Sequence, residues 1–212
     1  MKRVFTHEDQ EFFAKLSGDY NPIHIDKIRA RRLLYGSTVV HGVHLILWAL
    51  NCWFKKKKNN IELISIKTNF IRQLNVGEIA KVRFLDKENE HETIELWSDN
   101  ILITKIEFNW RIANFKKSHL YLKNAVPRKV KPRLINTKNI ANKFGSLGLY
   151  VDRKMTNKNF PALDNFALPI QIALILATTR LVGMHCPGLN SLFYELCISF
   201  NKLTKIKRLK YK

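Results

Sequence analysis

The hydrophobic and polar positions of this chain predict one helix that is apolar on every side, over residues 42–54. A helix without a polar face is buried all round. At about 1.5 Å per residue it spans roughly 20 Å, which is too short for a bilayer. Other parts of the protein must therefore enclose it.

Residues 61–112 follow with a period of two between apolar and polar side chains, as in half-buried strands. We expect a long strand over 61–75 and three further strands, separated by turns at 76–78, 86–89 and 98–100. Short turns between such strands are typical of an antiparallel meander with one buried face. The pattern thus predicts an α+β fold in which a sheet curls around a helix.

Two short helices and a turn are expected before the apolar helix. Thr6 and Asp9 have the spacing of a capping box at the start of the first helix, which ends at Ser17. Asn21, which precedes a proline, predicts an extended turn, because a residue in that position avoids the helical region. A second, basic helix is expected over residues 26–34.

The second half repeats the order of helix and strand incompletely. Residues 113–143 are rich in lysine and lack periodicity, which predicts a solvated linker. A second apolar helix is expected over about 168–182. The remaining expectations are strands at 147–151 and 189–200, a loop at 160–163 and a basic tail at 202–212.

These segments predict three parts of the chain. Residues 1–115 form a domain that carries the chemistry, residues 116–145 form a basic linker, and residues 146–212 form a partial, non-catalytic unit.

Charge raises the question of a nucleic-acid partner. The chain has 37 basic and 17 acidic residues, a net charge of +20. Nucleic-acid binders usually cluster such charge on one face. Here lysine, often next to asparagine, is spread along the whole chain, so we expect no specific nucleic-acid partner. Attraction of a polyanionic carrier such as coenzyme A remains compatible with the charge.

Cysteine usage and hydropathy point to a reduced, cytoplasmic protein. The three cysteines lack metal-ligand spacing, and Cys52 and Cys197 lie in apolar segments where we expect small core residues. We therefore predict no metal. The N-terminus has no apolar signal-peptide core, and no span of about twenty apolar residues occurs.

Residues 17–26 and 40–43 carry the candidate chemistry. A carboxylate at Asp19, an amide at Asn21 and an imidazole at His24 lie within six residues, shortly before Gly42 at the start of the apolar helix. A carboxylate and an imidazole within reach of one water can divide the proton transfers of a hydration. Free N–H groups at the helix start can hold a developing oxyanion.

Each of these residues also has an ordinary structural explanation. A Gly-Asp-x-Asn-Pro segment by itself is a common turn, since Asp and Asn bond their own backbone. A lone His24 is more often structural than catalytic. The functional hypothesis depends on finding all these residues in order, with the buried helix and the meander behind them.

That conjunction resembles the MaoC-like hot-dog family of (R)-specific enoyl-thioester hydratases and dehydratases. The resemblance rests on Leu16 to Asp26, then Ala30, Gly36 and Val40-His41-Gly42. It implies catalysis by Asp19 and His24, with Asn21 shaping the site and the Gly42 amide holding the thioester oxygen. It implies no cofactor beyond a substrate carried as a thioester of coenzyme A or acyl carrier protein in fatty acid metabolism. His41 is expected to be a buried structural histidine.

Residues 180–192 are similar to the end of the central helix in a second hot-dog unit of double-hot-dog proteins. This unit lacks the Asp-x-Asn-Pro-x-x-His segment, so we expect it to bind the acyl chain or to complete a dimer-like pairing. A full unit needs about three more strands, which suggests a truncated gene or the leading part of a longer polypeptide. Because a hot-dog sheet usually pairs with a second one, we expect either a homodimer or an internal pseudo-dimer.

Two functions remain open from the sequence. The first is reversible hydration of a 2-enoyl thioester, a lyase reaction. The alternative is a non-catalytic acyl-thioester binding or assembly module, a fragment of a larger biosynthetic protein.

Overall fold

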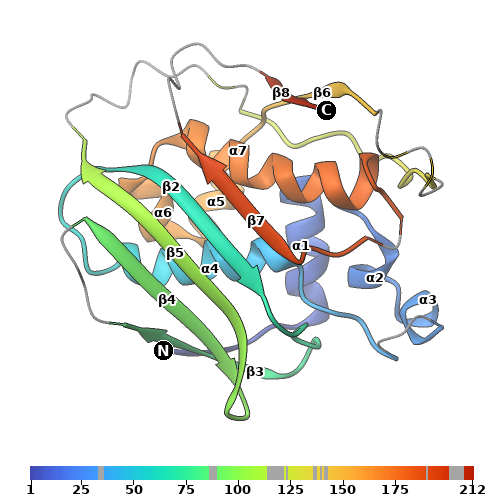
Figure 1. Ribbon diagram of the computed structural model, residues 1–212, viewed down its shortest axis with the longest axis horizontal. Helices are drawn as coiled ribbons and strands as arrows, with labels where there is room; N and C mark the ends of the chain where they lie inside the picture. Colours follow the sequence, from blue (N-terminus) through green and yellow to red (C-terminus); the bar gives the residue numbers. More distant parts are fainter. Residues whose placement is uncertain are drawn as a thin grey trace.

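Two apolar helices lie side by side behind a curved antiparallel sheet in the computed structural model (Figure 1). They are α4 (Gly42–Phe54) and α7 (Pro169–Arg180), which match the two predicted apolar helices. The structure describes residues 1–32, 36–85, 90–113, 122, 124–135, 138, 140, 143–189, 191–200 and 208–212. Among these, no helix combines the length and the apolar character that a membrane crossing requires.

The main sheet confirms the predicted antiparallel strands, but the predicted four-strand meander is wrong in its order, because the strand that begins at Ile61 pairs with the fourth strand and not with the second. Its strands follow the order β1-β3-β4-β5-β2-β7, and every neighbouring pair is antiparallel. The strands from the first half are β1 (Lys2–Val4), β2 (Ile61–Phe70), β3 (Ile79–Phe84), β4 (His91–Ser98) and β5 (Ile101–Ile112). Strand β2 ends at Phe70 rather than 75, and β1 was not predicted because three residues are too few to show a period.

The two halves of the chain share one sheet. Strand β7 (Glu195–Ser199) pairs with β2, from Ser65 opposite Ser199 to Asn69 opposite Glu195. Buried side chains from both halves form a single hydrophobic core. This pairing is internal to the chain. The predicted domain boundaries themselves remain predictions.

The buried polar residues of the central helices connect them to their neighbours. Of the 13 residues in α4, 12 are buried, including Asn51. Its Oδ1 accepts the N–H groups of Ala162 and Leu163 at the start of α6 (Pro161–Phe166). In α7, the Gln171 amide bonds both the N–H and the carbonyl of Leu63, beside a bulge in β2. These bonds of Asn51 and Gln171 tie the two helices to neighbouring backbone inside the core.

The segment before α4 contains one more helix than predicted. Helix α1 (His7–Ser17) has the expected capping box and ends at Gly18, whose φ of 79° suits glycine. Asn21 avoids the helical region as predicted, with φ −59° and ψ 126°, but the chain then enters α2 (Pro22–Ile25), which was not predicted. The Asn21 side chain accepts the Ile23 N–H, and proline suits the first helical position.

Helix α3 (Lys27–Arg31) follows with Asp26 as its N-cap. The last two residues of the predicted helix, 33 and 34, lie outside the described residues.

The second half also differs from the prediction in several places. Helix α5 (Arg153–Asn159) was not predicted, and α6 replaces the expected loop at 160–163. Strand β6 (Gly145–Gly148) pairs with β8 (Arg208–Tyr211), so the end of the expected basic tail is a strand. Residues 201–207 lie outside the described part. Helix α7 continues into a π-helical turn at Leu181–His185.

Cys52 is buried as expected, but the prediction for Cys197 is wrong. Its side chain is exposed, because the alternation along β7 points Leu196 toward the core and Cys197 away from it.

His44 is an unusual core residue of α4. Its ring stacks on Phe13 with centroids 4.5 Å apart and meets the edges of Phe5 and Phe160. Neither ring nitrogen has a hydrogen-bond partner among the described residues. Burial holds the pKa of this imidazole well below its usual range, and the charge of Arg3 adds to the shift. His44 is therefore neutral in the folded protein.

We predict that His44→Phe weakens the acid sensitivity of the fold. Below a pH of about 6.5, His44 binds a proton in the unfolded chain but not in the folded protein. The contribution of His44 to the free energy of unfolding is therefore fully present above that pH and is lost progressively as the pH falls below it. The free energy of unfolding, measured in urea at pH 7.5 and 5.0, should fall less in the variant, by up to about 1 kcal/mol per pH unit. Equal acid sensitivity in His44→Phe and the wild type would contradict the prediction.

Candidate active site

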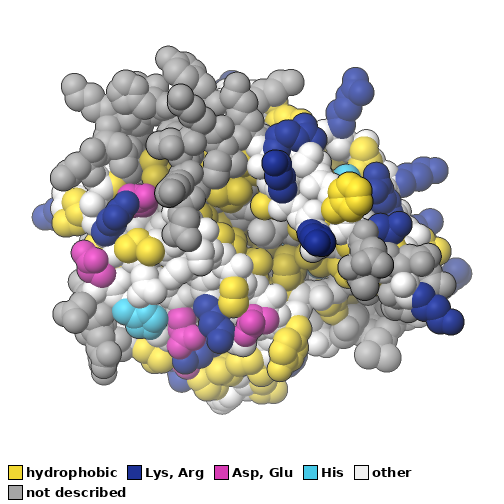
Figure 2. Space-filling view, turned by 45° about the horizontal axis from the view of Figure 1, so that its top comes forward, with side chains coloured by type: hydrophobic (Ala, Val, Ile, Leu, Met, Phe, Trp, Pro, Cys, Tyr) yellow, Lys and Arg dark blue, Asp and Glu magenta, His cyan; other side chains and the backbone are white. Residues whose placement is uncertain are grey.

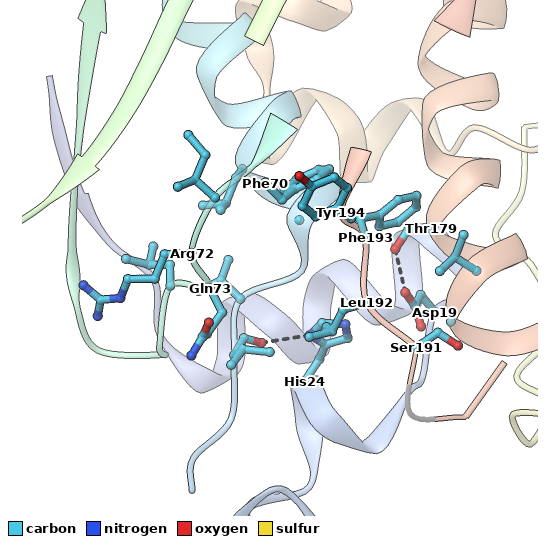
Figure 3. A pocket seen from close by; sticks show the side chains of 18 residues that line it. Asp19, His24, Phe70, Arg72, Gln73, Thr179, Ser191, Leu192, Phe193 and Tyr194 are labelled. Atoms are coloured by element: carbon cyan, nitrogen blue, oxygen red, sulfur yellow. Dashed lines mark hydrogen bonds between the residues drawn. The ribbon is translucent and has the colours of Figure 1, made fainter. Parts of the chain in front are cut away.

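A cavity of about 270 Å³ lies where the two halves meet (Figure 3). Asp19, His24 and Gly42 all line it, so the structure brings together three of the four predicted site residues. Asn21 lies behind the wall, where its side-chain NH₂ donates to the carbonyl of Gly183. The remaining lining comes from residues around the start of α4, from the end of β2 and the segment after it, from α7 and the π-helical turn that follows it, and from the residues that lead into β7.

Asp19 is a buried carboxylate with donors on both oxygens. Only 1% of the residue is exposed. The Thr179 hydroxyl donates to Oδ2 over 2.5 Å, and the Asn21 N–H donates to Oδ1 over 3.1 Å. Burial raises the pKa of this carboxyl, while His24, the Thr179 hydroxyl and the Asn21 N–H oppose the rise. A raised pKa suits a group that must both take and return a proton.

His24 faces the cavity from α2 in a defined tautomer. Its Nδ1 lies 2.9 Å from the carbonyl oxygen of Val39. A carbonyl only accepts, so Nδ1 carries the proton and Nε2 of the neutral ring offers a lone pair. Burial lowers the pKa of this imidazole, while Asp19 and the Val39 bond oppose that shift. The neutral ring is thus an acceptor.

The separation of these two groups fits a shared water. A carboxylate oxygen of Asp19 and a ring nitrogen of His24 lie within 4.8 Å of each other. Two atoms that each bond one water at about 2.8 Å, in tetrahedral directions, are about 4.6 Å apart. A water bonded to both Asp19 and His24 is compatible with this limit.

Gly42 begins α4 at the same cavity. The His41 N–H is taken by Gln10 Oε1, and the His44 N–H by the His41 carbonyl. This leaves the N–H of Gly42 without a partner in the described part of the chain, as expected for a first helical turn. A Cβ at this position would lie 2.7 Å from the ring of Phe70, so glycine keeps the approach to the helix end narrow but open.

Two residues of the second half complete the site and were missed in the sequence. Thr179 holds the Asp19 carboxylate from α7 (Figure 3). Gly183, in the π-helical turn, lies so close that a Cβ there would be 2.2 Å from Asp19 Oδ1. Both contacts span about 160 positions, so no local motif reports them. A glycine inside an otherwise apolar helix end was the one signal present.

His41 has the structural contacts that were expected. Its Nδ1 contacts Gln10 Oε1 and its Nε2 contacts the carbonyl of Asp19. Asp19, His24 and His41 place possible metal ligands within 4.8 Å of one another. The rings of His24 and His41 are stacked at 3.8 Å, however, so their in-plane lone pairs do not converge on one centre. This geometry favours a water over a metal ion.

Comparison with known proteins agrees with this fold. The MaoC-like domain family matches residues 2–104. A MaoC-like dehydratase structure is 13% identical, with a TM-score of 0.52 over 84% of this chain and 68% of that chain. An (R)-hydratase from A. caviae involved in PHA biosynthesis is 20% identical, with a TM-score of 0.42 over 53% of this chain and 92% of that one.

R-hydratase PhaJ1 from Pseudomonas aeruginosa is 18% identical, with a TM-score of 0.44 over 53% of this chain and 77% of that one. No curated protein matches the chain. At such low identities the structural likeness bears on the fold alone. The match to the MaoC-like dehydratase extends through both halves, and it confirms the predicted α+β hot-dog fold. The similarity to the MaoC-like domain family covers residues 2–104, just under half of this chain.

Proposed function

We propose that this protein catalyses the reversible addition of water to a 2-enoyl thioester, giving a 3-hydroxyacyl thioester of (R) configuration. The proposal rests on one observation: Asp19, His24 and Gly42 line the same cavity. The reaction requires proton acceptors that activate a water and a hydrogen-bond donor that stabilises the oxyanion.

In the hydration direction, Asp19 and His24 together take one proton from the water they hold. The water oxygen bonds to C3, and the electron pair of the C2=C3 bond moves toward the thioester carbonyl. The Gly42 N–H stabilises the enolate oxygen that results. The proton held by the pair returns to C2, the enolate collapses to the thioester, and the atoms of one water have been added. Dehydration reverses these steps.

The cavity offers separate regions for the acyl chain and its carrier. Leu45, Phe70 and Phe193 give an apolar region, with the two phenylalanine rings 5.6 Å apart. Arg72 and Gln73 are exposed or half-exposed on another side (Figure 3). An apolar region with a few placed polar groups is typical of a small-molecule site.

The site favours catalysis over the binding module that the sequence left open. A module that only holds an acyl chain has no need for a buried carboxylate with two hydrogen-bond donors, because such a group is costly to desolvate. The internal pairing of β2 with β7 likewise supports a pseudo-dimer within one chain over a homodimer.

Removal of either member of the pair should abolish hydration. We expect Asp19→Asn and His24→Gln to lower kcat by about 10²–10⁴-fold, because each removes a proton acceptor that the reaction requires. The rate is followed by loss of the ultraviolet band of a crotonyl thioester. Asp26→Asn and His91→Gln are matched controls, because they make the same substitutions at residues that do not line the cavity, and they should retain full activity. Full activity in Asp19→Asn or His24→Gln, with thermal melts like the wild type, would refute the proposed site.

The Thr179 hydroxyl should influence how the activity of the Asp19–His24 pair depends on pH. It lowers the pKa of Asp19, so Thr179→Val should raise that pKa and move the acidic limb of the kcat/KM profile to higher pH. We also expect kcat to fall about tenfold at neutral pH, since the carboxylate loses a positioning bond. Thr179→Ser keeps the hydroxyl and should restore the wild-type profile. If Thr179→Val lowers activity equally at every pH, Thr179 has only a packing role.

A further inference from the structure

Two basic segments are exposed beside the cavity. They are residues 26–32 and 128–133, and together we call them the basic rim. The basic rim contains eight Lys or Arg side chains and one acidic side chain, Asp26. All eight basic residues are exposed: Lys27, Arg29, Arg31, Arg32, Arg128, Lys129, Lys131 and Arg133.

Both segments of the basic rim are tied to elements that line the cavity. The first includes α3, which directly follows the helix that carries His24. In the second, the Lys129 ammonium lies 5.0 Å from the ring centre of Tyr20, next to Asp19 in the chain. The backbone of Arg133 bonds Met184 and Leu189, just before the residues that lead into β7 and line the cavity.

The charge of the basic rim is largely uncompensated. On the outer face of the sheet, basic residues pair with acidic ones, as Lys105 does with Glu107 at 2.7 Å and Arg111 with Glu62 at 2.8 Å. Within the rim, Arg29 alone has an ion pair among the described residues, with Asp26 at 3.6 Å. Figure 2 shows Lys and Arg gathered on the right-hand part of the molecule, where Figure 1 places α2 and α3. Such a surface attracts an anionic partner.

Exposed apolar side chains lie in and beside the same segments. Ile28 is 69% exposed, Val130 45% and Leu134 78%, and Tyr194 at the cavity lining is 83% exposed. Apolar groups surrounded by charges are typical of a protein interface, with an apolar centre and a charged rim. Phosphate groups make no use of apolar side chains, whereas a folded partner does.

We propose that the basic rim is a docking surface for an acidic acyl carrier protein, which delivers its thioester-bound acyl chain into the cavity. This inference rests on the proposed function and chooses between the two carriers that the sequence left open. Coenzyme A carries its phosphates on one nucleotide, whereas the exposed charges and apolar side chains of the basic rim belong to two separate segments. A nucleic acid would bind the charges but would deliver nothing to a cavity that contains Asp19 and His24.

The test compares two carriers of the same acyl group. Crotonyl is loaded on a bacterial acyl carrier protein and, separately, on coenzyme A. The double variant Arg31→Glu/Lys131→Glu reverses one exposed charge in each segment and changes no residue of the cavity lining. We expect its kcat/KM for the carrier-protein substrate to fall about 10–100-fold, through KM, with little change in kcat. Turnover of the coenzyme A substrate should change less than about twofold.

Lys2→Glu/Lys58→Glu is the matched control. It makes the same change in net charge at two exposed positions, on the edge strand β1 and beyond the C-terminal end of α4. It should leave both substrates unaffected. Binding of the unloaded carrier protein, measured by calorimetry, should weaken with salt in the wild type and be lost in the rim variant.

The outcomes separate this inference from the proposed function. Rim-dependent binding of the carrier protein without hydration of either substrate would uphold the docking surface and refute the hydratase. Equal losses for both substrates would show that the rim holds the phosphates of coenzyme A, which overturns the inference. Wild-type binding to duplex DNA but not to the carrier protein would overturn it as well.

Discussion

A carboxylate that is almost completely removed from water is the constraint on which the rest of this structure depends. Burial of a charge without partners is costly, so Asp19 requires polar partners within reach. The Asn21 N–H and His24 come from the first half of the chain, and the Thr179 hydroxyl comes from the second. Neither half of the chain alone supplies all the partners of Asp19. The site is therefore a property of the pairing between them.

The packing of the two central helices makes that pairing possible. Because α4 has no polar face, it must be enclosed, and the sheet, α6 and α7 enclose it. Gln171 fixes α7 to β2 through Leu63, and β7 continues the same sheet. These contacts place the C-terminal end of α7 opposite the N-terminal end of α4. The cavity forms where the two ends meet.

Features encoded locally could be predicted from the sequence. The bounds of α4 follow from an apolar run with no polar face, the capping box of α1 from two residues three positions apart, and the proximity of Asp19 to His24 from their short spacing. Features that depend on distant contacts could not. Thr179 and Gly183 look like ordinary helix residues until the fold brings them to Asp19. Strand β1 is too short for a period, and Cys197 was misplaced because an apolar strand does not reveal which face is buried.

The central claim is that the second half shapes the Asp19 carboxylate, and Gly183→Ala tests it most directly. Alanine is favourable in a helix, so the variant should fold. Its methyl group, however, would occupy a position 2.2 Å from Asp19 Oδ1, which must then move. We predict a cooperative thermal melt at a somewhat lower temperature, a displaced carboxylate in the crystal structure of the variant, and a hydration rate at least about 100-fold lower. An undisplaced Asp19 with wild-type turnover would contradict the account.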